Sequence, residues 1–112
     1  MGERLMIMSH SIAHALAETA NNQLIEESNK ALHIRGICLV GNDAPITREE
    51  ALAQMTECAQ RATAIWRAAT IFIVPPLADA AHEIGRVRSM YRVCMREIAT
   101  HLKYVVTPSS PE

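Results

Sequence analysis

Two segments with a regular apolar stripe make up residues 47–105, TREEALAQMTECAQRATAIWRAATIFIVPPLADAAHEIGRVRSMYRVCMREIATHLKYV, and they meet at Val74-Pro75-Pro76. In the first segment the apolar residues recur at alternating steps of three and four, which is the repeat of a helix that packs along its length. They are Leu52, Met55, Ala59, Ala62, Trp66, Ala69 and Ile73. Thr47 and Glu50 have the spacing of a capping box, which marks the start of this helix.

The two prolines separate this helix from the next one. Pro75 lacks an amide proton and clashes one turn back, so it ends the first helix, whereas Pro76 suits the first turn of a second helix. The stripe then resumes at Leu77, Ala80, Ala81, Ile84, Val87, Tyr91, Cys94, Met95, Ile98, Leu102 and Val105. We expect helices over residues 48–73 and 76–105 that form an antiparallel hairpin. One long helix kinked at the prolines is the alternative.

A further helix is expected at about residues 9–35, with a serine cap at its start and Gly36 just past its end. Its stripe is narrow and rich in small residues, which bury little area each: Ile12, Ala13, Leu16, Ala20, Leu24, Ala31 and Ile34. Ile25 and Leu32 lie off that stripe. This helix is therefore expected to touch two neighbours, and a second subunit is one candidate.

One short stretch, Ile37-Cys38-Leu39-Val40, has the composition of a strand, although a lone strand leaves its backbone groups unpaired. It could pair with its own copy in a dimer or with residues 104–107, or lie as an apolar loop over the bundle. Residues 108–112 have the composition of a disordered tail. The sequence thus predicts one helical domain over residues 1–107 and a tail over 108–112.

Composition favours an all-α fold. Of 112 residues, 49% are hydrophobic, only 4% are aromatic and four are glycine, which suits packed helices better than a sheet sandwich. A net charge of −1 gives no global attraction to nucleic acid or to an anionic membrane. Three cysteines without a Cys-x-x-Cys pair do not make a disulfide framework, so we expect a reducing, cytoplasmic location.

No membrane or targeting segment is expected. The apolar run at residues 5–8 stops at Ser9, far short of a signal peptide. The uncharged run at residues 68–78 contains two prolines and is too short to cross a bilayer.

Residues that could bind a metal are few. His10, His14 and Glu18 share one helix face, but a metal site also needs further ligands and supporting residues. Asp79 and His82 have the spacing found in carboxylate-bridged iron bundles, which need two such pairs. The sequence therefore predicts no metal and no cofactor.

A catalytic pair is equally hard to find. Cys94 and His101 would lie about 10 Å apart along a helix, too far to share a hydrogen bond. Cys58 and Cys94 fall on the apolar stripes and are expected to be buried. We therefore predict that the protein has no catalytic residues.

The last helix is split by charge. At 100° per residue, four cations cluster on one flank of its stripe with no acid among them: Arg88, Arg92, Arg96 and Lys103. The opposite flank carries the acids, together with one arginine and one histidine: Asp79, Glu83, Glu97, Arg86 and His101.

Three explanations compete for the basic flank. It could pair with acids of the other helices, such as Glu18, Glu26, Glu27 or Glu57. It could bind a protein partner with an acidic face, because arginine beside apolar residues is typical of interface hot spots. It could bind nucleic acid or phosphate, although four cations release few counterions.

The sequence as a whole predicts an all-α bundle of three long helices, assembling as a homodimer. We expect a small non-enzymatic protein-interaction module, such as a regulator, an inhibitor or a chaperone-like adaptor. A nucleic-acid-binding regulator that uses Arg88, Arg92, Arg96 and Lys103 is the alternative, and a metal-binding or enzymatic bundle is the third hypothesis.

Overall fold

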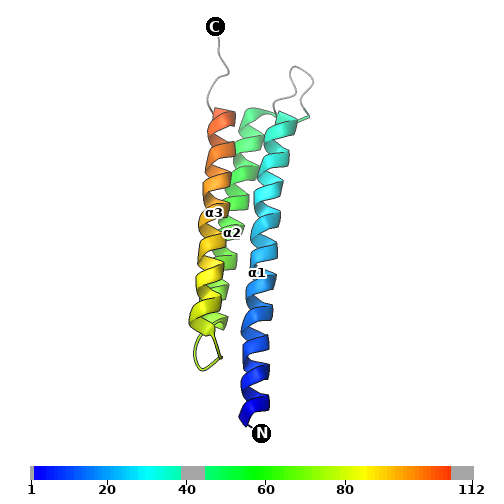
Figure 1. Cartoon of the computed structure of the whole chain (residues 1–112). Coiled ribbons are helices and arrows are strands. Elements are labelled where there is room, and N and C mark those ends of the chain that lie inside the picture. The colour runs from blue at the N-terminus through cyan, green and yellow to red at the C-terminus, as the bar shows by residue number, and fades with distance from the viewer. Residues whose placement is uncertain (1, 39–44, 107–112) are drawn as a thin grey trace.

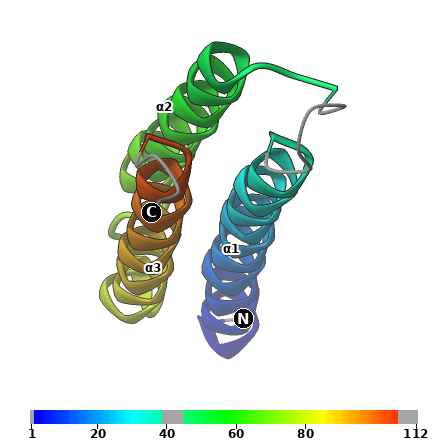
Figure 2. The same ribbon diagram turned by 90° about the horizontal axis from the view of Figure 1, so that it is seen from above.

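Three helices form the chain in a computed structural model, which describes residues 2–38 and 45–106, with the side chains of 12–38 and 45–106. They are α1 (Gly2–Cys38), α2 (Arg48–Phe72) and α3 (Ala80–Val106). The helices run side by side (Figure 1), and each packs against both others, as the end-on view in Figure 2 illustrates. The prediction of an all-α three-helix bundle is confirmed, and α2 and α3 form the expected antiparallel hairpin.

The start of α2 is the capping box that the sequence predicts. The Thr47 hydroxyl accepts the amide of Glu50 at 3.0 Å, and the Glu50 carboxylate accepts the amide of Thr47 at 2.8 Å. At the other end, the amide of Ile73 donates to the carbonyl of Ala69 at 2.9 Å. The helix therefore begins at Arg48 and ends shortly before Pro75, as expected.

Helix α1 is longer than predicted at both ends. It starts at Gly2 instead of near residue 9, because residues 3–8 include strong helix formers that extend the helix upstream of the serines. Gly36 lies inside the helix, which continues to Cys38. Burial of Ile34 and Cys38 against the bundle offsets the cost of a helical glycine, which is about 1 kcal/mol.

Helix α3 starts at Ala80, four residues later than predicted. Pro76 does not open the helix but lies in the turn that precedes it. Reversing the chain between two packed helices needs more than two residues, and here Leu77 donates its amide to the carbonyl of Val74 at 3.1 Å and packs against the core. Asp79 completes the reversal with a φ of 57°.

The predicted extended segment at residues 37–40 is wrong in its first half, since Ile37 and Cys38 are the last residues of α1. The helix provides the backbone hydrogen bonds that a lone strand would lack. Residues 39 and 40, and the predicted tail at 108–112, lie outside the described residues. In the described ranges no strand occurs, and none of the helices has the length and apolarity needed to span a membrane.

The core follows the predicted stripes on α2 and α3, and it follows the α1 stripe except at its first and third positions, Ile12 and Leu16. Met55, Cys58 and Cys94 are buried as expected. On α1 the buried positions are chiefly alanines, and Ile12 and Leu16, which the stripe places in the core, are 48% and 36% exposed. Small residues let α1 approach its neighbours closely, so the larger side chains beside them are left on the flank of the contact.

Truncation of Leu24 tests how much this core contributes to stability, because Leu24 is fully buried on α1. Leu24→Ala should lower the free energy of unfolding by about 2–5 kcal/mol, since it leaves a cavity between the helices. Urea unfolding followed by circular dichroism measures this. Leu32→Ala is the matched control, because Leu32 is 51% exposed on the same helix, and it should change stability by less than about 0.5 kcal/mol. Equal losses in the two variants would contradict this packing.

Candidate functional site

The four predicted site residues lie together on the outward side of α3. We call Arg88, Arg92, Arg96 and Lys103 the basic ridge. All four are exposed, because the opposite side of the helix packs into the core through Val87, Cys94, Ile98 and Val105. Successive members are one or two helical turns apart, so the cations form a row along the helix.

One end of the basic ridge is anchored on α2 by aromatic contacts. The guanidinium of Arg88 lies 5.6 Å from the centre of the Trp66 ring, within the range of a cation–π contact. Trp66 stacks on Tyr91 with a centroid distance of 5.7 Å and an interplanar angle of 9°. The Tyr91 hydroxyl lies 3.0 Å from that of Thr63. The α2–α3 contact therefore fixes the position of Arg88.

Three of the four acids proposed to pair with the basic ridge are engaged elsewhere, and the fourth, Glu26, lines a groove between α1 and α2. Glu18 pairs with Arg86 at 2.6 Å, and Glu27 pairs with Arg61 at 2.9 Å. Glu57 lies 3.9 Å from the same Arg61. In the part of the chain that the structure describes, no ion pair joins the basic ridge to an acid. The hypothesis of inter-helix pairing thus finds no support among these residues.

The neighbouring outer side of α2 also lacks acids. It forms a shallow groove lined by hydroxyl, amide and alanine side chains, by Ile71 and by one cation, Arg67. Arg67 is exposed and follows Trp66, the residue beneath Arg88. The sequence has no acid between Glu57 and Asp79. The positive charge of the basic ridge is therefore not offset from this side.

The opposite flank of α3 contacts α1 through a charge cluster of His14, Glu18, Glu83 and Arg86. Glu83 is 2% exposed and accepts a 2.6 Å bond from Arg86. Arg86 also donates to Glu18 at 2.6 Å, and His14 Nδ1 lies 3.4 Å from the Glu83 carboxylate. The predicted separation of charge on α3 therefore has a structural use, since the flank with the acids is an interface with α1.

Hydrogen bonds keep the carboxylates of this cluster ionised. Burial alone would raise the pKa of Glu83, but the bonds from Arg86 and His14 outweigh it and lower the pKa. The bond from Arg86 lowers the pKa of Glu18 as well.

A second polar contact joins α1 and α3 near their other ends. The guanidinium of Arg35 lies 3.2 Å from Nδ1 of His101 and 3.8 Å from the centre of the Tyr104 ring. His101 is buried, and its burial and the charge of Arg35 lower its pKa. A neutral imidazole that accepts from Arg35 at Nδ1 fits this site.

The residues considered for catalysis do not form a catalytic pair. The Cys94 thiol donates to the carbonyl of Leu24 at 3.2 Å, and burial raises its pKa to about 11, so it is a poor nucleophile at neutral pH. His101 contacts Arg35 instead of Cys94.

The residues considered for metal binding are not assembled either. Asp79 precedes α3 and does not share that helix with His82. His10 belongs to the segment whose side chains are not described. Among the described residues, no three histidine, cysteine or acidic side chains are grouped so that they could hold a metal.

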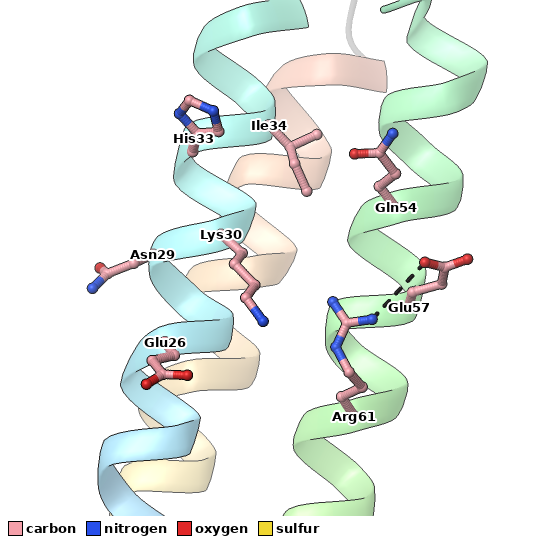
Figure 3. Close-up of a pocket in the computed structure, with 8 residues that line it drawn as sticks. All are labelled: Glu26, Asn29, Lys30, His33, Ile34, Gln54, Glu57 and Arg61. Carbon is pink, nitrogen blue, oxygen red and sulfur yellow. Dashed lines mark ion pairs between the residues drawn. The ribbon is translucent and has the colours of Figure 1, made fainter.

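A polar groove between α1 and α2 was missed by sequence reasoning. It has a volume of about 1030 Å³ and lies between charged side chains of both helices (Figure 3). Its lining balances two acids against two bases, with mostly uncharged polar neighbours: Glu26, Glu57, Lys30, Arg61, Asn29, His33, Gln54 and Ile34. On each helix the lining residues are three or four positions apart and so share one face, which the sequence shows. Only the packing of α1 on α2 places the two faces opposite each other.

The charge cluster and His101 predict that the free energy of unfolding decreases as the pH is lowered. A folded pKa below the ordinary 6.5 means that the unfolded chain binds the His101 proton first, so stability decreases as pH falls below about 6.5. The lowered pKa values of Glu18 and Glu83 add a second loss as pH falls below about 4.5. Urea unfolding at several pH values measures both steps.

His101→Gln should remove the upper step and leave the lower one, whereas Arg86→Met should weaken the lower step. A parent protein whose unfolding free energy stays constant between pH 7 and 5 would contradict the assignment of the upper step to His101.

Comparison of the chain with protein-family models, with curated proteins and with solved structures finds no match.

Proposed function

We propose that this protein is a non-enzymatic interaction module that binds an acidic face of a protein partner through the basic ridge of α3. The observation that carries the proposal is the exposure of four cations that no acid neutralises among the described residues. One of them, Arg88, lies against Trp66, and both arginine and tryptophan are enriched in binding hot spots. The roles of regulator, inhibitor or adaptor, and a cytoplasmic location, belong to this proposal.

The surroundings of the basic ridge support a binding role for these residues. A cation that stabilises its own fold is normally found against a carboxylate, as Arg61 and Arg86 are. The members of the basic ridge have no such partner in the described chain, and side by side they repel one another. An acidic surface would relieve that repulsion and would steer the encounter.

A photo-reactive residue at Ser89, next to Arg88 of the basic ridge, should capture the partner, whereas one at Ala53 on α2 should not. Both positions are exposed. With the captured protein purified, combining Arg92→Glu and Arg96→Glu should raise its Kd by about 30-fold or more, as expected for hot-spot residues. Isothermal titration calorimetry measures this change.

Arg48→Glu is the control for charge, because Arg48 is an exposed cation on α2. It should leave the Kd unchanged. A partner captured equally from Ala53, or bound equally by the doubly substituted protein, would refute the proposal.

Binding of nucleic acid is the second candidate, since the same four cations match a row of phosphates. Four phosphate contacts on duplex DNA predict that log K falls with log salt with a slope of about −3.6. The substitutions Arg92→Glu and Arg96→Glu should reduce the magnitude of that slope by about 2. Titration of a labelled duplex at several salt concentrations measures it. Retention on a polyanion column that is unchanged by both substitutions would reject this candidate.

A further inference from the structure

Beyond the polar groove, the α1–α2 contact continues as an apolar groove. Leu16 and Ala20 line it from α1, and Ile65, Ala68 and Phe72 line it from α2. No charged residue is part of its lining, and its volume is about 120 Å³. Phe72 is 62% exposed and Leu16 is 36% exposed. Water thus contacts large apolar side chains in a hollow that none of the three helices fills.

More apolar surface lies at the same end of the bundle. Ile12, Ile71 and Val74 are 48%, 66% and 40% exposed. Ile12 lies one helical turn before Leu16 on α1, and Val74 directly follows Ile73 of the groove. Ile71 lines the neighbouring groove on the outer side of α2. Exposed apolar side chains near a hollow of this kind are typical of a contact with another molecule.

Helix α1 reaches past the rest of the bundle at this end (Figure 1). The contact between His14 and Glu83 places residue 14 level with the first turn of α3. Residues 2–11 therefore form an overhang with a length of about 15 Å. Its sequence contains the uninterrupted apolar run Leu5-Met6-Ile7-Met8.

We propose that the protein is an antiparallel dimer in which the overhang of each copy, residues 2–11, lies in the apolar groove of the other. A two-fold axis at this end of the bundle turns each overhang back along the groove of the other copy. The groove spans residues 16–23 of α1, about 11 Å, so the overhang is long enough to cover it. Each overhang then becomes a fourth helix beside α1 and α2.

The chemistry of the groove selects a second copy as its occupant. An uncharged lining gives no attraction to a highly charged partner, whereas the overhang supplies an apolar run from the same chain. Because a two-fold contact is isologous, one arrangement covers both grooves and both overhangs. Each copy thus buries both its own overhang and its own groove. The two areas together help to reach the roughly 800 Å² per partner of a stable interface.

This proposal is independent of the basic ridge, and it is tested on the full chain by light scattering coupled to size-exclusion chromatography over a range of concentrations. The parent protein should have twice the chain mass of 12.4 kDa. Leu5→Glu on the overhang and Phe72→Glu in the groove should each raise the dimer Kd by about 30-fold or more, because both place a charge in the contact.

Leu32→Glu is the matched control, since it also adds a glutamate at an exposed leucine of α1 but away from the groove. It should leave the dimer intact. Where Phe72→Glu lowers helicity, Thr19→Arg replaces it, because Thr19 is exposed and lines the groove. A parent protein that is monomeric throughout, or a dimer that the overhang and groove variants leave intact, would overturn the proposal.

A photo-reactive residue at position 72 provides a direct readout. In the dimer it should cross-link to residues 2–11 of the partner subunit, which mass spectrometry of the linked peptides identifies. Links between copies that fall only outside the overhang would also overturn the proposal.

Discussion

Two buried carboxylates, each held by an arginine, fix helix α1 in the bundle. Glu27 of α1 is 5% exposed and is bonded by Arg61 of α2. Glu83 is bonded by Arg86 of the same helix, α3, and this pair reaches α1 because Arg86 also bonds Glu18. Either carboxylate without its guanidinium would be strongly destabilising, because an unpaired charge would remain buried. The alanines of α1 bury little area each. Correct placement of α1 therefore depends on these charge contacts as well as on apolar packing.

The same pairs explain why a chain with a net charge of −1 presents a basic surface. Glu27 and Glu83 are turned into the helix contacts, where arginines neutralise them, and Glu18 takes part in the same cluster. The cations of α3 that face outward have no such partners among the described residues. Net charge thus describes the whole chain but not the face that a partner meets. The outward side of α3 can attract an anionic partner although the chain as a whole is slightly acidic.

Periodicity and capping were enough to predict α2, α3 and the basic ridge, because each is a property of one helix. The start of α3 at Ala80 was not predictable from Pro76, since the length of the turn depends on how Leu77 packs between the helices. The exposure of Ile12 and Leu16 depends on which side of α1 approaches the others most closely. Both grooves need the packing of α1 on α2, which no rule applied to a single helix provides.

The two proposed surfaces use different helices, and this allows them to act together. The apolar groove is lined by α1 and α2 and the residue that follows α2, whereas the basic ridge lies on α3. A dimer formed through the groove leaves both ridges exposed and relates them by the two-fold axis. A partner with two acidic sites at the matching distance would then bind both ridges, and the second contact would be intramolecular. Weak binding by four cations on one chain would become strong binding by the dimer, so the interaction would depend on protein concentration through dimerisation.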